Sequence, residues 1–145
     1  KKLKEENKKI VPITHKEMTR FFISKKDAVE FVVDSLIQMN GGEIFVPKIP
    51  SFKITELAKV IFKECKFKII GIRPGEKIHE VLISKEESSY TKEFKDNYII
   101  YPIILDNRII PNKEKFINNE YSSKNNKNFL NNRQIFAFLK KYKLI

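Results

Sequence analysis

Apolar residues recur along the chain at two spacings, which predict helices alternating with short strands. Six of them fall at helical spacing on one broad face: Ala28, Val29, Val32, Val33, Leu36 and Ile37. Ser24 precedes this run as a candidate helix cap, and residues 40–42, Asn-Gly-Gly, supply a glycine exit. A second amphipathic helix is predicted from Ile54 to Cys65, because its apolar residues follow the i, i+3, i+4, i+7 rule.

Short apolar runs between these helices predict strands. Residues 43–46 are typical of a strand covered on both faces, and residues 67–72 of one buried strand. Ile10 to Thr14 is interrupted by Pro12, which favours an edge strand or an extended loop. The order helix, strand, helix, strand predicts an α/β fold.

The second half of the chain carries weaker patterns. Residues 81–83 fit a short strand, residues 84–87 a capped helical turn, and residues 97–104 a strand that Pro102 marks as an edge. Residues 118–128 are polar enough for a loop or arm, and Asn131 with Gln134 predicts the cap of a terminal helix. We therefore interpret residues 1–145 as a single region, with 118–145 as its tail arm and terminal helix.

Composition narrows the classes of protein and partner. The chain has 145 residues, 41% of them hydrophobic, and no apolar run approaches the ~20 residues that span a membrane. The net charge of +11 raises a nucleic-acid partner, but 25 of the 29 basic residues are lysines spread along the chain, and no stripe rich in arginine and aromatic residues accompanies them. Cys65 has no second cysteine to pair with, which favours a reducing cytoplasm.

The residues that best predict a ligand site follow the strand at 67–72. Pro74 and Gly75 end this strand, and Pro74 keeps Arg73 in an extended conformation. The planar fork of Arg73 suits a phosphate, and the carboxylate of Glu76 suits sugar hydroxyls, so the pair fits a nucleotide. The alternative interpretation is that Arg73 and Glu76 form a solvated ion pair in an ordinary surface turn.

Several kinds of catalytic site are missing from the sequence. The glycines, Gly41, Gly42, Gly71 and Gly75, cannot build a dinucleotide fingerprint or a P-loop. No Tyr-x-x-x-Lys pair lies in a credible catalytic setting, and the two histidines and one cysteine offer no metal-ligand spacing. His79 beside Glu80 is typical of a surface pair. The residues themselves thus indicate a chain that binds without catalysing.

Several motifs, in order, resemble the C-terminal part of the inverting UDP-N-acetylglucosamine 4,6-dehydratases. Residues 12–15 read Pro-Ile-Thr-His and 17–23 Glu-Met-Thr-Arg-Phe-Phe-Ile, while 41–50 read Gly-Gly-Glu-Ile-Phe-Val-Pro-Lys-Ile-Pro and 70–77 Ile-Gly-Ile-Arg-Pro-Gly-Glu-Lys. The tail from Glu120 to Leu130 is also similar. This family belongs to the extended short-chain dehydrogenases/reductases and serves pseudaminic acid and related surface polysaccharide synthesis. One departure is His15, where the family commonly has Asp.

The resemblance implies specific roles and partners. Thr14, Arg73 and Glu76 match family residues that contact the UDP-sugar, and Arg20 matches an arginine placed on the nucleotide diphosphate, with a structural ion pair as the alternative. The implied fold is the C-terminal substrate-binding region of a Rossmann-type enzyme. The implied cofactor is NADP, bound by an N-terminal half that this chain lacks, together with the catalytic residues. A homo-oligomer in the cytoplasm, without nucleic acid or membrane, is expected for the whole enzyme.

The first residues support the interpretation of a fragment. The chain begins at Lys1 within a charged stretch, residues 1–9, that is typical of the end of a helix. Two alternatives remain at this point: a stand-alone module that binds UDP-sugars without catalysis, and a basic nucleic-acid-binding domain.

Overall fold

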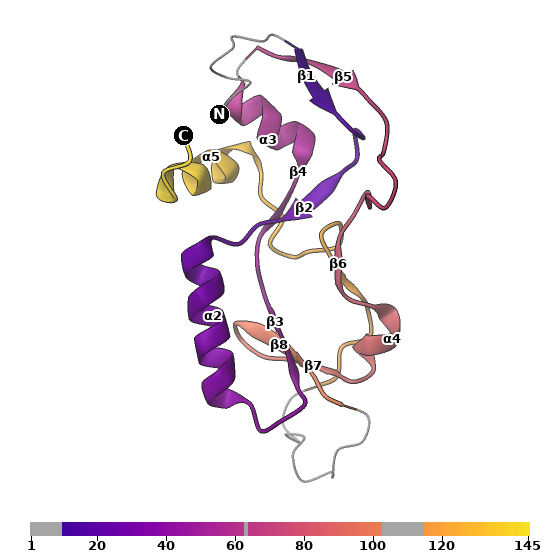
Figure 1. Ribbon diagram of the computed structural model, residues 1–145, viewed down its shortest axis with the longest axis vertical. Coiled ribbons are helices and arrows are strands. Elements are labelled where there is room, and N and C mark those ends of the chain that lie inside the picture. The colour runs from indigo at the N-terminus through magenta and orange to yellow at the C-terminus, as the bar shows by residue number, and fades with distance from the viewer. Residues whose placement is uncertain (1–9, 63, 103–114) are drawn as a thin grey trace.

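The computed structural model describes residues 10–62, 64–102 and 115–145, which form an elongated body (Figure 1). The helices of this part are α2 (Lys25–Gln38), α3 (Ile54–Ile61), α4 (Lys85–Ser88) and α5 (Asn132–Lys141). The strands are β1 (Ile10–Ile13), β2 (Thr19–Phe21), β3 (Ile44–Pro47), β4 (Ser51–Lys53), β5 (Lys66–Ile69), β6 (Val81–Ile83), β7 (Thr91–Glu93), β8 (Asn97–Ile100) and β9 (Tyr121–Ser122). The predicted α/β class is confirmed.

The strands pair in small separate sheets. β1 and β5 run parallel, with Ile10 opposite Lys66 and Ile13 opposite Ile69. β2 pairs antiparallel with β4, and β6 with β9, while β8 lies between β3 and β7 in an antiparallel sheet. In Figure 1 the pair β1–β5 lies at one end of the body with α3, and the β3–β8–β7 sheet lies towards the other end.

The core of the described residues is divided between the ends of the body. One cluster joins the β3–β8 sheet to β6 and β9, and its members are Val46, Ile83, Tyr98, Ile100 and Tyr121. A second places α5 against α3 and β4, and it contains Phe52, Leu130, Ile135 and Leu139. A third lies under β1, where Val11 and Ile13 pack on Ala58. Each cluster combines residues far apart in sequence. Residues after 118 contribute buried side chains to the first and second clusters.

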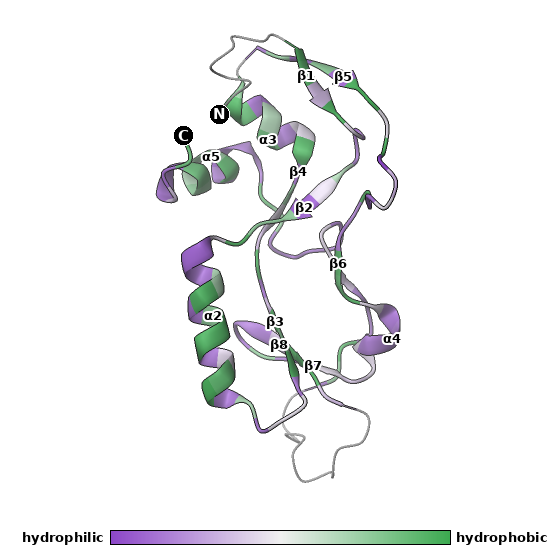
Figure 2. Ribbon diagram, in the orientation of Figure 1, coloured by the Kyte–Doolittle hydropathy of each residue, from purple (hydrophilic) through white to green (hydrophobic). Residues whose placement is uncertain are grey.

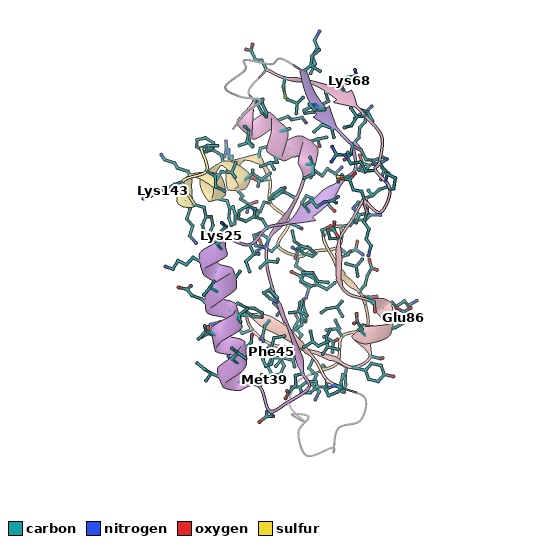
Figure 3. The ribbon with its side chains drawn as sticks, in the orientation of Figure 1. Lys25, Met39, Phe45, Lys68, Glu86 and Lys143 are labelled. Carbon is teal, nitrogen blue, oxygen red and sulfur yellow. The ribbon has the colours of Figure 1, made fainter. Side chains whose placement is uncertain are left out.

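Helix α2 forms as predicted, but its apolar face is left exposed. The Ser24 hydroxyl caps it by accepting the Asp27 N–H at 3.1 Å, and the helix ends before Gly41 and Gly42, both at positive φ. None of its residues is buried, and Leu36 is 63% exposed. Figure 2 shows the hydrophobic residues along this helix, and Figure 3 shows its side chains between Lys25 and Met39. Within the described part of the chain, nothing covers the face that the spacing defines.

Two predictions of strand burial are wrong. In β3 only Val46 is buried, while Ile44 on the same face is 57% exposed and Phe45 on the other face is half-buried, so neither face is fully covered. The strand predicted for 67–72 is β5, which ends at Ile69 and has no buried residue. Gly71, at φ +86°, turns the backbone away. The apolar residues of this segment predicted burial, but among the described strands β5 pairs only with β1, at the end of the body, where little packs against it.

The remaining local predictions are close to the structure. Helix α3 ends at Ile61, earlier than the predicted Cys65, because Phe62 is already extended. The strand at 81–83, the Ser84 capping box of α4 and the Asn131–Gln134 capping box of α5 are confirmed. β8 confirms the start of the strand predicted for 97–104, whose residues 103–104 lie outside the described residues, as does the predicted helix end in 1–9.

The polar segment 118–128 packs into the body, where the sequence suggested a loop or arm. Tyr121 belongs to a core cluster, and Ser122 and Ser123 are buried in full. The Asn126 amide donates to the Ile49 carbonyl at 2.8 Å and contacts the Ser51 hydroxyl at 3.1 Å. Polar residues are buried here because each finds a partner, which is the condition for burying them at low cost.

Candidate functional site

The candidate site lies where the parallel strands β1 and β5 end. The Ile70 N–H donates to the Ile13 carbonyl at 2.9 Å, which extends the strand pairing by one residue. Thr14 and the segment from Gly71 to Glu76 therefore leave the sheet from the same edge. The carboxyl ends of parallel strands are the usual position of ligands in α/β proteins.

The turn from Arg73 to Glu76 is closed by two hydrogen bonds. The Glu76 N–H donates to the Arg73 carbonyl at 3.0 Å, and the Arg73 N–H donates to Glu76 Oε2 at 3.2 Å. Gly75 adopts φ +79°, a conformation that glycine permits at no steric cost. Gly75 and the two hydrogen bonds between Arg73 and Glu76 thus form a compact loop.

The side chain of Arg73 has no partner in the described part of the molecule. Its guanidinium is exposed and forms no hydrogen bond or ion pair with any described residue. The alternative of an Arg73–Glu76 ion pair is therefore not what the structure contains. An exposed guanidinium beside a fixed turn is available to bind an anion from solvent.

Arg20 holds the other side of this loop. Its Nη2 lies 3.6 Å from Glu76 Oε1, and its Nε lies 3.4 Å from Glu80 Oε1. Its Nη1 also donates to the carbonyls of Thr19 and Ile78, at 2.7 and 3.1 Å. Arg20 therefore connects β2 to the segment 76–80 and fixes the carboxylate of Glu76.

Thr14 lies next to this group without touching it. Its hydroxyl donates to the Met18 sulfur at 3.1 Å, and thioether sulfur is a weak acceptor. The side chain is half-buried, and no described contact joins it to Arg73 or Glu76. The structure thus brings Arg20, Glu76 and the Arg73 backbone together and places Thr14 at the end of the neighbouring strand.

The sequence analysis missed a polar network behind the loop. Thr19 Oγ1 lies 2.8 Å from His79 Nδ1 and 2.7 Å from the hydroxyl of Ser123, and the Glu80 N–H donates to that hydroxyl at 2.9 Å. The interpretation of His79 as part of a surface pair is wrong, since its ring is half-buried against Thr19. The spacing of these residues, up to 104 positions, gave no local pattern to recognise them by.

Burial and charge favour a neutral His79. Burial first, and then the nearby ammonium of Lys124, lower the pKa of His79 below its ordinary value of 6.5. Among the described residues no group of three or more histidine, cysteine or acidic side chains could hold a metal ion. The chemistry that these residues offer is therefore hydrogen bonding and binding of anions.

The chain is similar in sequence to known proteins. The chain is 53% identical to a UDP-N-acetylglucosamine 4,6-dehydratase (inverting) of Campylobacter jejuni over 104 residues, covering 72% of this chain and 31% of that protein. It is 40% identical over 137 residues to an uncharacterized membrane protein of Methanocaldococcus jannaschii, covering 81% of this chain and 41% of that protein. No helix in the described part of this chain is long and apolar enough to cross a membrane.

The fold is also shared with a solved structure. Pen from Bacillus thuringiensis matches with a TM-score of 0.83 at 23% identity, over 99% of this chain and 44% of that chain. The chain thus spans less than half the length of each of these relatives. The family model described as polysaccharide biosynthesis protein matches residues 1–102, and the chain belongs to this family.

Proposed function

We propose that this chain is the UDP-sugar-binding portion of a C5-inverting UDP-N-acetylglucosamine 4,6-dehydratase that acts in bacterial surface polysaccharide or nonulosonic acid synthesis. One observation carries the proposal: the Arg73 guanidinium is exposed and without a described partner, beside a Glu76 carboxylate that Arg20 fixes. The 53% identity to the Campylobacter enzyme supports the choice of substrate.

We assign each site residue a separate role. Arg73 binds the UDP diphosphate, because its fork can form two charge-assisted hydrogen bonds. Glu76 accepts hydrogen bonds from the ribose hydroxyls, and Thr14 contributes a hydroxyl at the end of β1. The contacts of Arg20 favour an indirect role, in which it positions Glu76 rather than binding phosphate itself. Binding of the nucleotide then holds the sugar for chemistry performed elsewhere in the enzyme.

The described residues do not fit a dinucleotide cofactor. Gly41 and Gly42 lie in a turn after α2, and Gly71 and Gly75 lie in residues 71–76, the candidate substrate loop. No glycine-rich turn therefore opens a helix. We propose that the whole enzyme uses NADP, bound by the part of its relatives' length that this chain does not span. No step of the dehydration is assigned to residues of this chain.

The setting of the whole enzyme is part of the same proposal. We place it in the cytoplasm, since a free thiol at Cys65 suits a reducing compartment. We expect a homo-oligomer that takes UDP-N-acetylglucosamine as substrate, without a nucleic-acid or membrane partner. The lysine-rich surface is explained without nucleic acid, because its charges are dispersed along the chain.

Turnover tests the proposal. We expect the full-length protein with NADP to dehydrate UDP-N-acetylglucosamine with inversion at C5, which nuclear magnetic resonance of the product would show. The 145-residue chain should give no product under the same conditions. Turnover by this chain would contradict its assignment as a binding portion, and a full-length protein that binds UDP but never turns over would favour a non-catalytic module.

A salt titration tests the nucleic-acid alternative. Binding of random DNA through dispersed lysines would weaken steeply with salt and would show no preference for UDP. We expect the chain to retain UDP in 200 mM salt and to lose DNA.

A further inference from the structure

A cleft of about 380 Å³ opens beside β2, next to the candidate substrate loop but without Arg73 or Glu76 in its lining. His15, His79, Lys53 and Lys124 contribute the basic side chains of its wall. Its one carboxylate, Glu17, is paired with Lys53 at 2.8 Å. Lys124 forms no ion pair or hydrogen bond with any described residue, so the cleft carries an uncompensated positive charge.

The hydrogen bonds of His15 fix where its ring carries a proton. The Glu17 backbone N–H donates to His15 Nδ1 at 3.1 Å. A backbone N–H can only donate, so Nδ1 is the acceptor and the neutral ring is protonated at Nε2. His15 therefore offers an N–H donor from a ring that lines the cleft.

A series of buried hydrogen bonds behind the cleft assigns the same tautomer to His79. Ser123 is fully buried, and its hydroxyl accepts the Glu80 N–H. Among the described residues, the acceptor for the Ser123 hydroxyl proton is Thr19 Oγ1, which lies 2.7 Å away. Thr19 must then donate its proton to His79 Nδ1 at 2.8 Å, because the opposite direction would leave a buried Ser123 proton unpaired. His79 is thus also protonated at Nε2.

We propose that this cleft binds a small oxyanion of the phosphate class, held by the Nε2–H groups of His15 and His79 and by the ammonium of Lys124. Two neutral donors and one charge suit the oxygens of a tetrahedral anion. A carboxylate in place of His15 would repel the anion.

Titration of the full-length protein with inorganic phosphate at pH 7.5 tests the site. Nitrogen-resolved nuclear magnetic resonance should show both rings protonated at Nε2, and phosphate should shift the Nε2 resonances of His15 and His79. We expect His15→Asp and Lys124→Met to weaken phosphate binding by about fivefold or more, since each removes a direct favourable contact. Lys127→Met is the matched control in the same segment and should bind phosphate unchanged.

A second ligand separates this site from the proposed nucleotide site. Phosphate could be bound free or as part of a nucleotide, so UDP is titrated in parallel, with Arg73→Ala as the distinguishing variant. We expect Arg73→Ala to weaken UDP and leave phosphate unchanged. The proposal is overturned if the wild-type chain binds no phosphate, if His15→Asp binds it equally well, or if Arg73→Ala lowers phosphate binding as much as UDP binding. The proposed UDP-sugar-binding function would still stand in any of these cases if Arg73→Ala alone lost UDP binding.

Discussion

Arg20 Nη2 lies 3.6 Å from Glu76 Oε1, across a gap of 56 residues in the sequence, and this pair ties β2 to the candidate substrate loop. Both side chains are about three-quarters covered. The pair leaves Arg73, on the same turn, without a charged partner among the described residues. Arg20, which the family resemblance placed on the nucleotide diphosphate, thus makes internal contacts, while Arg73 is free to bind.

A double-mutant cycle of Arg20→Met and Glu76→Gln measures this tie. We expect a coupling of about 0.5 to 1 kcal/mol in the free energy of unfolding, because the pair is partly shielded from solvent. The exposed Lys26–Glu30 pair, at 3.7 Å on α2, is the control and should couple by about 0.3 kcal/mol or less. Equal coupling in both pairs would show that Arg20 gives the loop no special support.

The packing of the tail is tested by two neighbouring residues of α5. Ile135 is 1% exposed against α3 and β4, whereas Phe136 is 52% exposed. Ile135→Ala should lower the free energy of unfolding by about 2 to 4 kcal/mol, and Phe136→Ala by less than about 1 kcal/mol. Urea unfolding measures both. Similar small losses would mean that the terminal helix is an arm and not part of the core.

Local features of the fold could be predicted from the sequence. The caps at Ser24, Ser84 and Asn131 depend on residues three positions apart, and each forms as predicted. The lengths of α2 and α5 follow from the same local rules. Burial did not follow, because the exposed β5 and the exposed face of α2 depend on which other segments pack on them.

The candidate site was predictable only in part. The turn chemistry of Pro74, Gly75 and Glu76 indicated a ligand loop, and the structure forms a closed turn there. The contacts that support it are non-local: Thr19, His79 and Ser123 meet across 60 and 104 positions. No periodicity or spacing rule connects such residues, so neither the network nor the cleft beside it could be predicted from the sequence.

The exposed apolar face of α2 should make the 145-residue chain self-associate or unfold with poor cooperativity. Val29, Val32, Val33, Leu36 and Ile37 are all at least half exposed. Leu36→Glu should reduce association, measured by light scattering alongside calorimetry. Gln38→Glu adds the same charge on another side of the helix and should have little effect. A sharp two-state transition in a monomeric wild-type chain would contradict this expectation.

The lowered pKa of His79 predicts a dependence of stability on pH. Because burial depresses the pKa in the folded state, the unfolded chain binds more protons below about pH 6.5. The contribution of His79 is therefore complete above that pH and is lost as the pH falls through the folded-state value. Urea unfolding at pH 7.5 and 5.5 should show a smaller loss of stability in His79→Gln than in the wild type. An equal loss in both proteins would show that His79 titrates normally, since His15 is common to them.

Calorimetric titration of the full-length protein with UDP, comparing wild type with Arg73→Ala and Arg73→Lys, shows whether Arg73 binds the diphosphate. If Arg73 clamps the diphosphate, Arg73→Ala should weaken binding by about 2 to 4 kcal/mol, with only part of that recovered by Arg73→Lys, which lacks the fork. Glu76→Gln should cost about 1 to 2 kcal/mol, since one acceptor remains for the ribose. UDP-N-acetylglucosamine should show the same losses as UDP, which places both residues on the nucleotide. An Arg73→Ala protein that is folded and binds UDP as tightly as the wild type would show that Arg73 does not bind the diphosphate.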